Sequence, residues 1–184
     1  MKIADSALDL IGNTPLVRLG RIAQRHGIEP VLAKLEKCNP AGSAKDRVAL
    51  SMVLDAEEKG LLRPGATIVE PTSGNTGVGL AMVAALRGYS LVLTMPASMS
   101  VERQKLLKAL GARIELTPAQ AGMGGAVARA EEILRETPGA FMPSQFDNPA
   151  NPAAHAQTAR EILRDTDGQV DVFVATVGTG GTVS

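Results

Sequence analysis

The chain has 184 residues, 45% of them apolar, and its 19 basic residues balance its 19 acidic residues. A zero net charge, with neither a basic run nor an aromatic platform, argues against nucleic acid as a partner. The first residues include an acid and no continuous apolar stretch, and the longest apolar run, near residues 80–86, is too short to cross a bilayer, so we expect a soluble cytoplasmic protein without a membrane partner.

Strand and helix patterns alternate along the chain. A turn at residues 12–15 precedes the first expected strand. Strands are predicted at residues 16–19, 31–36, 67–70, 91–95, 113–116, 140–142 and 172–177, and helices at 46–59, 75–87, 101–110, 125–136 and 153–164. Such alternation with short connections predicts an α/β fold in which helices cover both faces of a parallel sheet. Ligands of such sheets bind beyond the carboxyl ends of the strands.

A turn at residues 39–47, here called the lysine turn, places Lys45 at the opening of the predicted helix 46–59. The positive end of a helix dipole repels a cation and lowers the pKa of an amine. A lysine in that position is suited to lose its proton and attack a carbonyl carbon. A lone lysine is more often a solvated surface residue, so the interpretation depends on the rest of the chain.

Two further segments follow predicted strands and are rich in hydrogen-bond donors suited to anions. The Thr72 loop, residues 72–77, reads Thr-Ser-Gly-Asn-Thr-Gly and opens the predicted helix 75–87, whose almost wholly apolar sequence indicates burial on nearly all sides. The glycine loop, residues 178–182, reads Gly-Thr-Gly-Gly-Thr. It lacks the Gly-x-Gly-x-x-Gly spacing of dinucleotide sites.

The lone cysteine, Cys38, cannot form a disulfide within the chain, which agrees with a reducing compartment, and we expect it to be a small buried residue. His26 and His155 lack Cys or His companions at metal-ligand spacing. We therefore expect no metal site and assign both histidines to packing or to a helix surface.

The lysine turn, the Thr72 loop and the glycine loop follow one another along the chain. In that order they resemble the motifs of the fold-type II pyridoxal-phosphate enzymes, and most closely those of the cysteine synthases, also called O-acetylserine sulfhydrylases. The resemblance covers nearly the whole chain. It extends over residues 11–16, the lysine turn, residues 70–77, 95–96, 105–111 and 145–152, and the glycine loop.

The resemblance implies that Lys45 forms a Schiff base with pyridoxal 5'-phosphate and then moves the substrate's α-proton, and that Asn75 hydrogen-bonds the phenolic oxygen of the cofactor. The implied phosphate-binding residues are Gly178, Thr179, Gly180, Gly181 and Thr182. The residues implied to bind the substrate's carboxylate are Thr72, Ser73, Gly74, Thr76 and Gln145.

The implied reaction replaces the acetoxy group of O-acetyl-L-serine by sulfide, giving L-cysteine and acetate. Thiosulfate or another thiol donor stays open, although Glu70-Pro71 and residues 95–100 look more like the sulfide-using A-type enzymes. Family members form homodimers, and some bind the C-terminal tail of serine acetyltransferase. The resemblance therefore implies a homodimer, and binding of serine acetyltransferase stays open.

The resemblance also implies two domains. We expect residues 1–36 to pack partly against the second domain, residues 37–145 to form the smaller α/β domain, and residues 146–184 to begin the larger one. The second domain is expected to be incomplete, because the chain stops where a helix should follow the glycine loop. The group that contacts the pyridine nitrogen lies later in family sequences.

Three alternatives stay open. A related pyridoxal-phosphate enzyme, such as a cystathionine β-synthase core or a threonine or serine dehydratase, would share Lys45 and a glycine loop. A nucleotide-binding Rossmann module would use the glycine loop differently. A non-catalytic fragment of such an enzyme would act, if at all, through partner binding.

Overall fold

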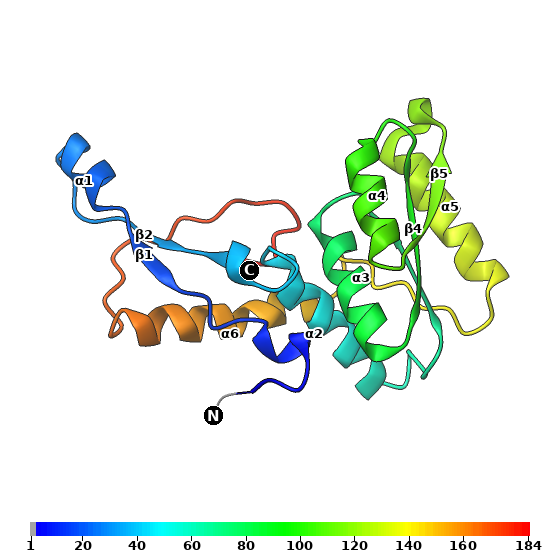
Figure 1. The fold of residues 1–184 in the computed structure, drawn as a ribbon, viewed down its shortest axis with the longest axis horizontal. Coiled ribbons are helices and arrows are strands. Elements are labelled where there is room, and N and C mark those ends of the chain that lie inside the picture. The colour runs from blue at the N-terminus through cyan, green and yellow to red at the C-terminus, as the bar shows by residue number, and fades with distance from the viewer. Residues whose placement is uncertain (1–2) are drawn as a thin grey trace.

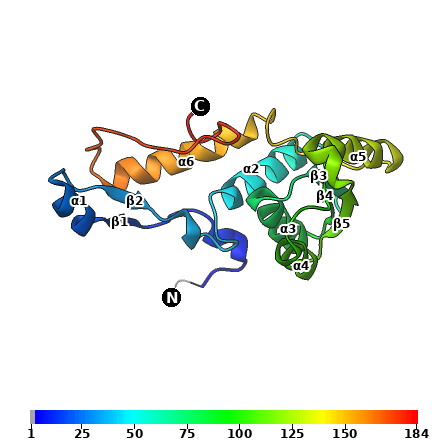
Figure 2. The same cartoon turned by 90° about the horizontal axis from the view of Figure 1, so that it is seen from above.

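A computed structural model describes residues 3–184 and has two lobes joined by α2 (Lys45–Glu58), as Figures 1 and 2 show. One lobe holds β3 (Thr67–Pro71), β4 (Ser90–Pro96) and β5 (Arg113–Thr117) with α3 (Asn75–Arg87), α4 (Val101–Ala109), η3 (Ala119–Ala121) and α5 (Gly122–Glu136). The other holds β1 (Leu16–Arg18), α1 (Gly20–His26), β2 (Leu32–Lys34) and α6 (Ala150–Asp165). Besides η3, the described residues include two further short 3-10 helices, η1 (Ala7–Leu10) and η2 (Glu36–Cys38).

The larger sheet is parallel, with the strand order β3-β4-β5. Alternate residues of a strand point to opposite faces of its sheet. Val69 and Val92 pack on one face against Ala130 of α5, whereas Ile68 and Leu93 belong to the cluster that α2 and α3 complete. Helices therefore cover both faces of a parallel sheet, which confirms the predicted α/β class.

The packing of α2 against α3 brings the lysine turn close to the Thr72 loop. Most of α3 is buried, as its apolar sequence predicts. A Cβ atom added at Gly79 would lie 2.9 Å from the backbone oxygen of Lys45 and 3.0 Å from the Cβ of Ala49. The two helices approach this closely because position 79 has no side chain.

Gly79→Ala is therefore expected to push α3 away from the first turn of α2 and to lower the free energy of unfolding by about 1–3 kcal/mol. Gly124→Ala is the matched control, because Gly124 also lies in a helix but a Cβ there would meet nothing within 4 Å. Urea unfolding followed by circular dichroism measures both. Equal effects of the two substitutions would contradict the close-approach explanation.

The predicted strands near the N-terminus form a separate sheet. β1 pairs with β2 antiparallel, with Leu16 opposite Lys34, and is not part of the parallel sheet. The helix between them, α1, was not expected from the sequence. Its apolar Ile22 is half exposed and only Ala23 is buried, so no amphipathic pattern marks this helix.

The strand expected at residues 172–177 is wrong: this segment has no regular structure. A strand needs a neighbour for its backbone N–H and C=O groups. None of the strands in residues 3–184 pairs with it, and Val172 and Val174 are 78% and 86% exposed. The strand expected at residues 140–142 is reduced to a single parallel bridge between Phe141 and Ile68.

The remaining expectations differ from the structure in smaller ways. The lysine turn follows η2 and not β2 directly, and Cys38 is exposed, so its expected burial is wrong. α6 begins three residues before its expected start, at Ala150. Within the described part of the chain, no helix combines the length and the apolar character needed to cross a membrane.

Candidate functional site at the lysine turn

The lysine turn is held by its own polar groups. The Asp46 carboxylate accepts hydrogen bonds from the backbone N–H of Ala41 at 2.6 Å and from the hydroxyl of Ser43 at 3.4 Å. The Ser43 oxygen in turn accepts from the backbone N–H of Lys45 at 3.1 Å. These contacts fix the direction in which the chain enters α2, and hence the position of Lys45 as its first residue.

Lys45 is half buried, and burial lowers the pKa of its ammonium group. Among residues 3–184, its Nζ atom has no hydrogen-bond or ion-pair partner that would keep the proton. The direction of this shift agrees with the expectation from the sequence, and burial is a second cause beside the helix dipole that the sequence invoked. The result is an amine that loses its proton more readily than a surface lysine.

A buried network of charged side chains lies directly after Lys45. The Arg47 guanidinium donates to both carboxylate oxygens of Glu161 at 2.8 Å and to both oxygens of Glu36 at 2.8 Å. Lys34 adds an ion pair to Glu161 at 2.8 Å. Burial alone would raise the pKa of the Glu161 carboxyl, but the bonds from Arg47 and Lys34 outweigh it and lower that pKa to about 2.

This network joins three parts of the chain around the lysine turn. The backbone N–H of Asn13 donates to Glu161 at 2.8 Å, and the N–H of Gly12 donates to the Asn39 side chain at 2.8 Å. Residues 12–14, the lysine turn and α6 are thereby held together. Glu36, Arg47 and Glu161 were not expected in the site, because a charged residue carries no local sign that it will be buried and paired.

The Thr72 loop contacts Gln145, as a shared site requires. The Thr76 hydroxyl donates to the side-chain oxygen of Gln145 at 2.5 Å, and both residues are buried. The Gln145 Nε2 makes no hydrogen bond within the described chain. Ser73 and Gly74 are half buried at the start of α3, and the Gly74 N–H donates to the Thr72 hydroxyl at 3.2 Å.

Asn75 is placed differently from the other loop residues. It is exposed, and its side-chain oxygen accepts a hydrogen bond from Arg103 of α4 at 3.2 Å. No hydrogen bond in the described residues joins its amide to the lysine turn or to the glycine loop. The structure thus assembles Thr76 and Gln145 but leaves Asn75 facing α4.

The glycine loop lies against α6. Asn151 donates from Nδ2 to the Thr179 hydroxyl at 2.9 Å and to the backbone oxygen of Gln145 at 2.8 Å. A Cβ at Gly181 would lie 2.1 Å from Oδ1 of Asn151, so only glycine fits there. Within residues 3–184, the backbone N–H groups of residues 178–182 donate to no other group. Free N–H groups on a glycine-rich turn fit an anion such as a phosphate.

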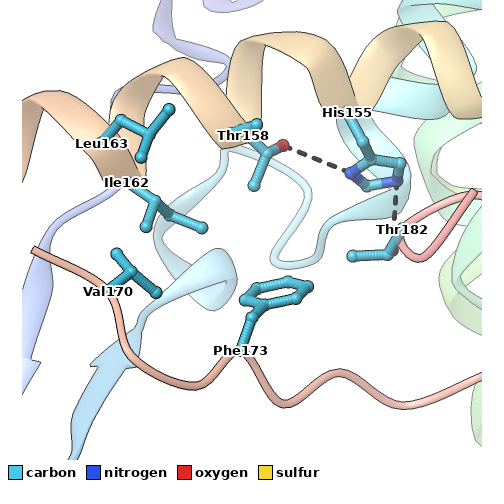
Figure 3. A pocket seen from close by; sticks show the side chains of 8 residues that line it. His155, Thr158, Ile162, Leu163, Val170, Phe173 and Thr182 are labelled. Carbon is cyan, nitrogen blue, oxygen red and sulfur yellow. Dashed lines mark hydrogen bonds between the residues drawn. The ribbon is translucent and has the colours of Figure 1, made fainter. Parts of the chain in front are cut away.

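His155 supports the same loop from the next turn of α6. Figure 3 shows its ring between two hydroxyls, with Nδ1 3.2 Å from Thr158 and Nε2 3.3 Å from Thr182. Burial, and then the charge of Lys45, lower the pKa of His155. His155 is therefore a buried packing residue, in agreement with the expectation, and no group of three potential metal ligands occurs in the described residues.

A cavity of about 230 Å³ lies beside this loop, between α6 and the irregular residues 170–173 (Figure 3). Its lining is mostly apolar and includes Ile162, Val170 and Phe173. Lys45 and Gln145 do not line it. The cavity adjoins the candidate site, because Thr182 of the glycine loop and His155 also line it.

Comparisons with known proteins show the family of the chain. The family described as pyridoxal-phosphate dependent enzyme matches residues 7–184. Cysteine synthase A of Escherichia coli (strain K12) is 57% identical over 95% of this chain and 53% of its own length. Among solved structures, a cysteine synthase of Entamoeba histolytica has a TM-score of 0.95 at 46% identity, over 99% of this chain and 55% of that one. An O-ureido-L-serine synthase has a TM-score of 0.94 at 52% identity, over 100% of this chain and 58% of that one.

These proteins are longer: the chain spans about half the length of the curated relatives that it matches, 53% in the case of the E. coli protein. The residues that match the family, 7–184, include the lysine turn, the Thr72 loop and the glycine loop. The chain belongs to the family of pyridoxal-phosphate-dependent enzymes.

Proposed function

We propose that the protein is a cysteine synthase, which replaces the acetoxy group of O-acetyl-L-serine by sulfide. The observation that carries this proposal is the continuous set of hydrogen bonds from Thr76 through Gln145 and Asn151 to Thr179. It joins the Thr72 loop to the glycine loop beside the helix that Lys45 opens. The names of the relatives from E. coli and E. histolytica support the same activity.

The residues fit pyridoxal 5'-phosphate. Gly178, Thr179, Gly180, Gly181 and Thr182 would hold its phosphate through their N–H and hydroxyl groups. When bound, the cofactor supplies an electron-withdrawing ring that stabilises negative charge at the substrate's α-carbon. Lys45, to which the cofactor would be attached, takes the α-proton on Nζ once it is released, because its lowered pKa favours the neutral amine.

The substrate's carboxylate would lie at the start of α3, held by Thr72, Ser73, Gly74, Thr76 and Gln145. Thr76 occupies the Gln145 oxygen, which leaves the Gln145 Nε2 available to donate to that carboxylate. The C–O bond to the acetoxy group breaks, acetate leaves, a C–S bond forms with sulfide, and Lys45 returns the proton to the α-carbon. The contact with Arg103 occupies only the side-chain oxygen of Asn75, which leaves its Nδ2 to donate to the cofactor's phenolic oxygen.

We further propose the division into residues 1–36, 37–145 and 146–184, with the first segment packing on the last. The ion pair between Lys34 and Glu161 supports this packing. A homodimer, a cytoplasmic location and binding of serine acetyltransferase are proposals drawn from the family resemblance alone.

Ser73→Ala is expected to raise the KM for O-acetylserine by roughly tenfold, because it removes a hydroxyl donor to a charged carboxylate. The affinity for pyridoxal phosphate should change by less than about threefold, since Ser73 lies in a different loop from the phosphate. Titration of cofactor and steady-state kinetics measure the two quantities. Equal losses in both would indicate a structural role for Ser73.

The function itself is tested by product analysis of the holoenzyme supplied with O-acetylserine and either sulfide or thiosulfate, and with serine or threonine alone. Cysteine and acetate in equal amounts support the proposal. A keto acid and ammonia from serine or threonine would assign a dehydratase instead. Neither product from a folded, cofactor-loaded protein would favour a non-catalytic role.

A further inference from the structure

Glu70, at the carboxyl end of β3, is a buried carboxylate with no cationic partner. It is 1% exposed. Its Oε2 accepts from the backbone N–H of Ser144 at 2.9 Å, and its Oε1 accepts from the N–H of Gln145 at 3.1 Å. Throughout residues 3–184, no charged side chain and no side-chain donor contacts this carboxylate. Its only ligands are therefore two successive N–H groups of one turn.

That turn has an unusual backbone. Ser144 has a φ of 54°, in the left-handed region that residues other than glycine rarely adopt. Successive N–H groups in such a conformation form a concave site for an anion. In most such sites the anion is a ligand, whereas here it is the side chain of Glu70. The carboxylate thus stabilises the conformation that the turn needs.

The turn carries Gln145, and Gln145 has contacts on two sides. Its side chain accepts from Thr76 at 2.5 Å, and its backbone oxygen accepts from Asn151, which also donates to Thr179. A shift of this turn would consequently move the carboxylate-binding side chain and disturb the support of the glycine loop. In the described chain the Glu70 carboxylate makes no hydrogen bond to the Thr72 loop or to the glycine loop.

We propose that Glu70 is a positioning residue, which holds Ser144 and Gln145 so that the Gln145 amide faces the substrate's carboxylate. The substrate named in this inference rests on the proposed function. The link between Glu70 and the turn rests on the two hydrogen bonds alone. A carboxylate accepts both N–H groups equally. A neutral carboxyl or an amide presents a donor to one of them.

The positioning should consequently depend on pH. Burial raises the pKa of Glu70 to about 7, although the N–H groups of Gln145 and Ser144 partly oppose this rise. Between about pH 4.5 and about pH 7 the folded protein keeps a proton that the unfolded chain has lost, so the free energy of unfolding falls as the pH rises through this window. Above about pH 7 the charged carboxylate accepts both N–H groups, and below it the turn loosens.

Glu70→Gln in the full-length gene product loaded with pyridoxal phosphate tests the proposal. We expect the KM for O-acetylserine to rise roughly tenfold while kcat and cofactor affinity change by less than about threefold. The fall in KM between about pH 6 and about pH 8 should disappear. Amide hydrogen exchange at Ser144 and Gln145 should accelerate by roughly tenfold. Glu57→Gln, at a carboxylate that contacts Arg87 and Tyr89 far from the turn, is the control and should change none of these.

Unchanged exchange at Ser144 and Gln145, or equal losses of substrate and cofactor affinity, would overturn the proposal. If the variant does not fold, the unmodified protein gives the answer: protection of the two amides, corrected for intrinsic exchange, should increase through about pH 7, and constant protection contradicts the proposal. A protein that shows this protection but makes no product from O-acetylserine would refute the proposed function and the substrate part of this inference. It would leave the link between Glu70 and the turn in place.

Discussion

Lys45→Ala is expected to abolish covalent attachment of pyridoxal phosphate and to lower kcat/KM for O-acetylserine by roughly 10³-fold or more. The reason is that one amine would serve as both the attachment point and the base. Because Lys45 is half buried and its Nζ has no partner in the described chain, the substitution should change the free energy of unfolding by only about 0.5 kcal/mol. A loss of activity could then not be attributed to unfolding.

Borohydride reduction followed by peptide mapping measures the attachment directly. In the unmodified protein, the reduced cofactor should be found on the peptide that contains Lys45. The matched control is Lys59→Ala, because Lys59 is exposed and pairs with Asp55 on the same helix surface. A reducible adduct that survives in Lys45→Ala would place the reactive amine elsewhere.

Arg47→Met should lower the free energy of unfolding by about 3–5 kcal/mol, since it leaves the half-buried Glu36 carboxylate without a cation and the buried Glu161 carboxylate with Lys34 alone. That loss is a large part of the stability of an ordinary domain, which is about 5–15 kcal/mol. Methionine retains much of the side-chain length, so lost packing contributes little. Urea unfolding measures the effect.

Arg87→Met is the control for this change, because Arg87 pairs with Glu57 at the surface and such pairs contribute about 0–1 kcal/mol. The pH dependence provides a second check. The pKa of Glu161 is lowered to about 2 and that of Glu36 is also lowered, so their contribution to stability is complete above the ordinary glutamate pKa of 4.5 and is lost as the pH falls toward 2. Arg47→Met should remove most of this acid sensitivity. An Arg47→Met protein as stable as Arg87→Met would contradict the assignment of the network.

Much of the fold could be predicted because local patterns and packing agree in the β3–α5 lobe. The apolar sequence of α3 indicates burial, and the structure places it between α2 and the sheet. Residues 172–177 have the same local character as a strand, but a strand also needs a neighbour, which no local pattern provides. α1 was missed for the opposite reason, since its sequence has no apolar stripe although its backbone is helical.

The residues of the candidate site likewise fall into those that sequence motifs predict and those that only the folded chain shows. Lys45, Thr76, Gln145 and Thr179 occur in motifs, so their types and order were sufficient to select them. Arg47 and Glu161 are separated by 114 positions, and only the folded chain brings them into contact. Glu70 appears in the sequence as one acid among 19 acidic residues. Its importance depends on burial and on the turn at Ser144, neither of which the sequence indicates.

The most direct test of the account is an absorbance spectrum taken with pyridoxal phosphate, before and after addition of O-acetylserine. It should be recorded for the 184-residue chain and for the full-length gene product in parallel. The account predicts the visible band of a lysine-bound cofactor in the full-length product, and a shift of that band when O-acetylserine is added. No band in either protein would contradict the assignment of Lys45 and of the whole site.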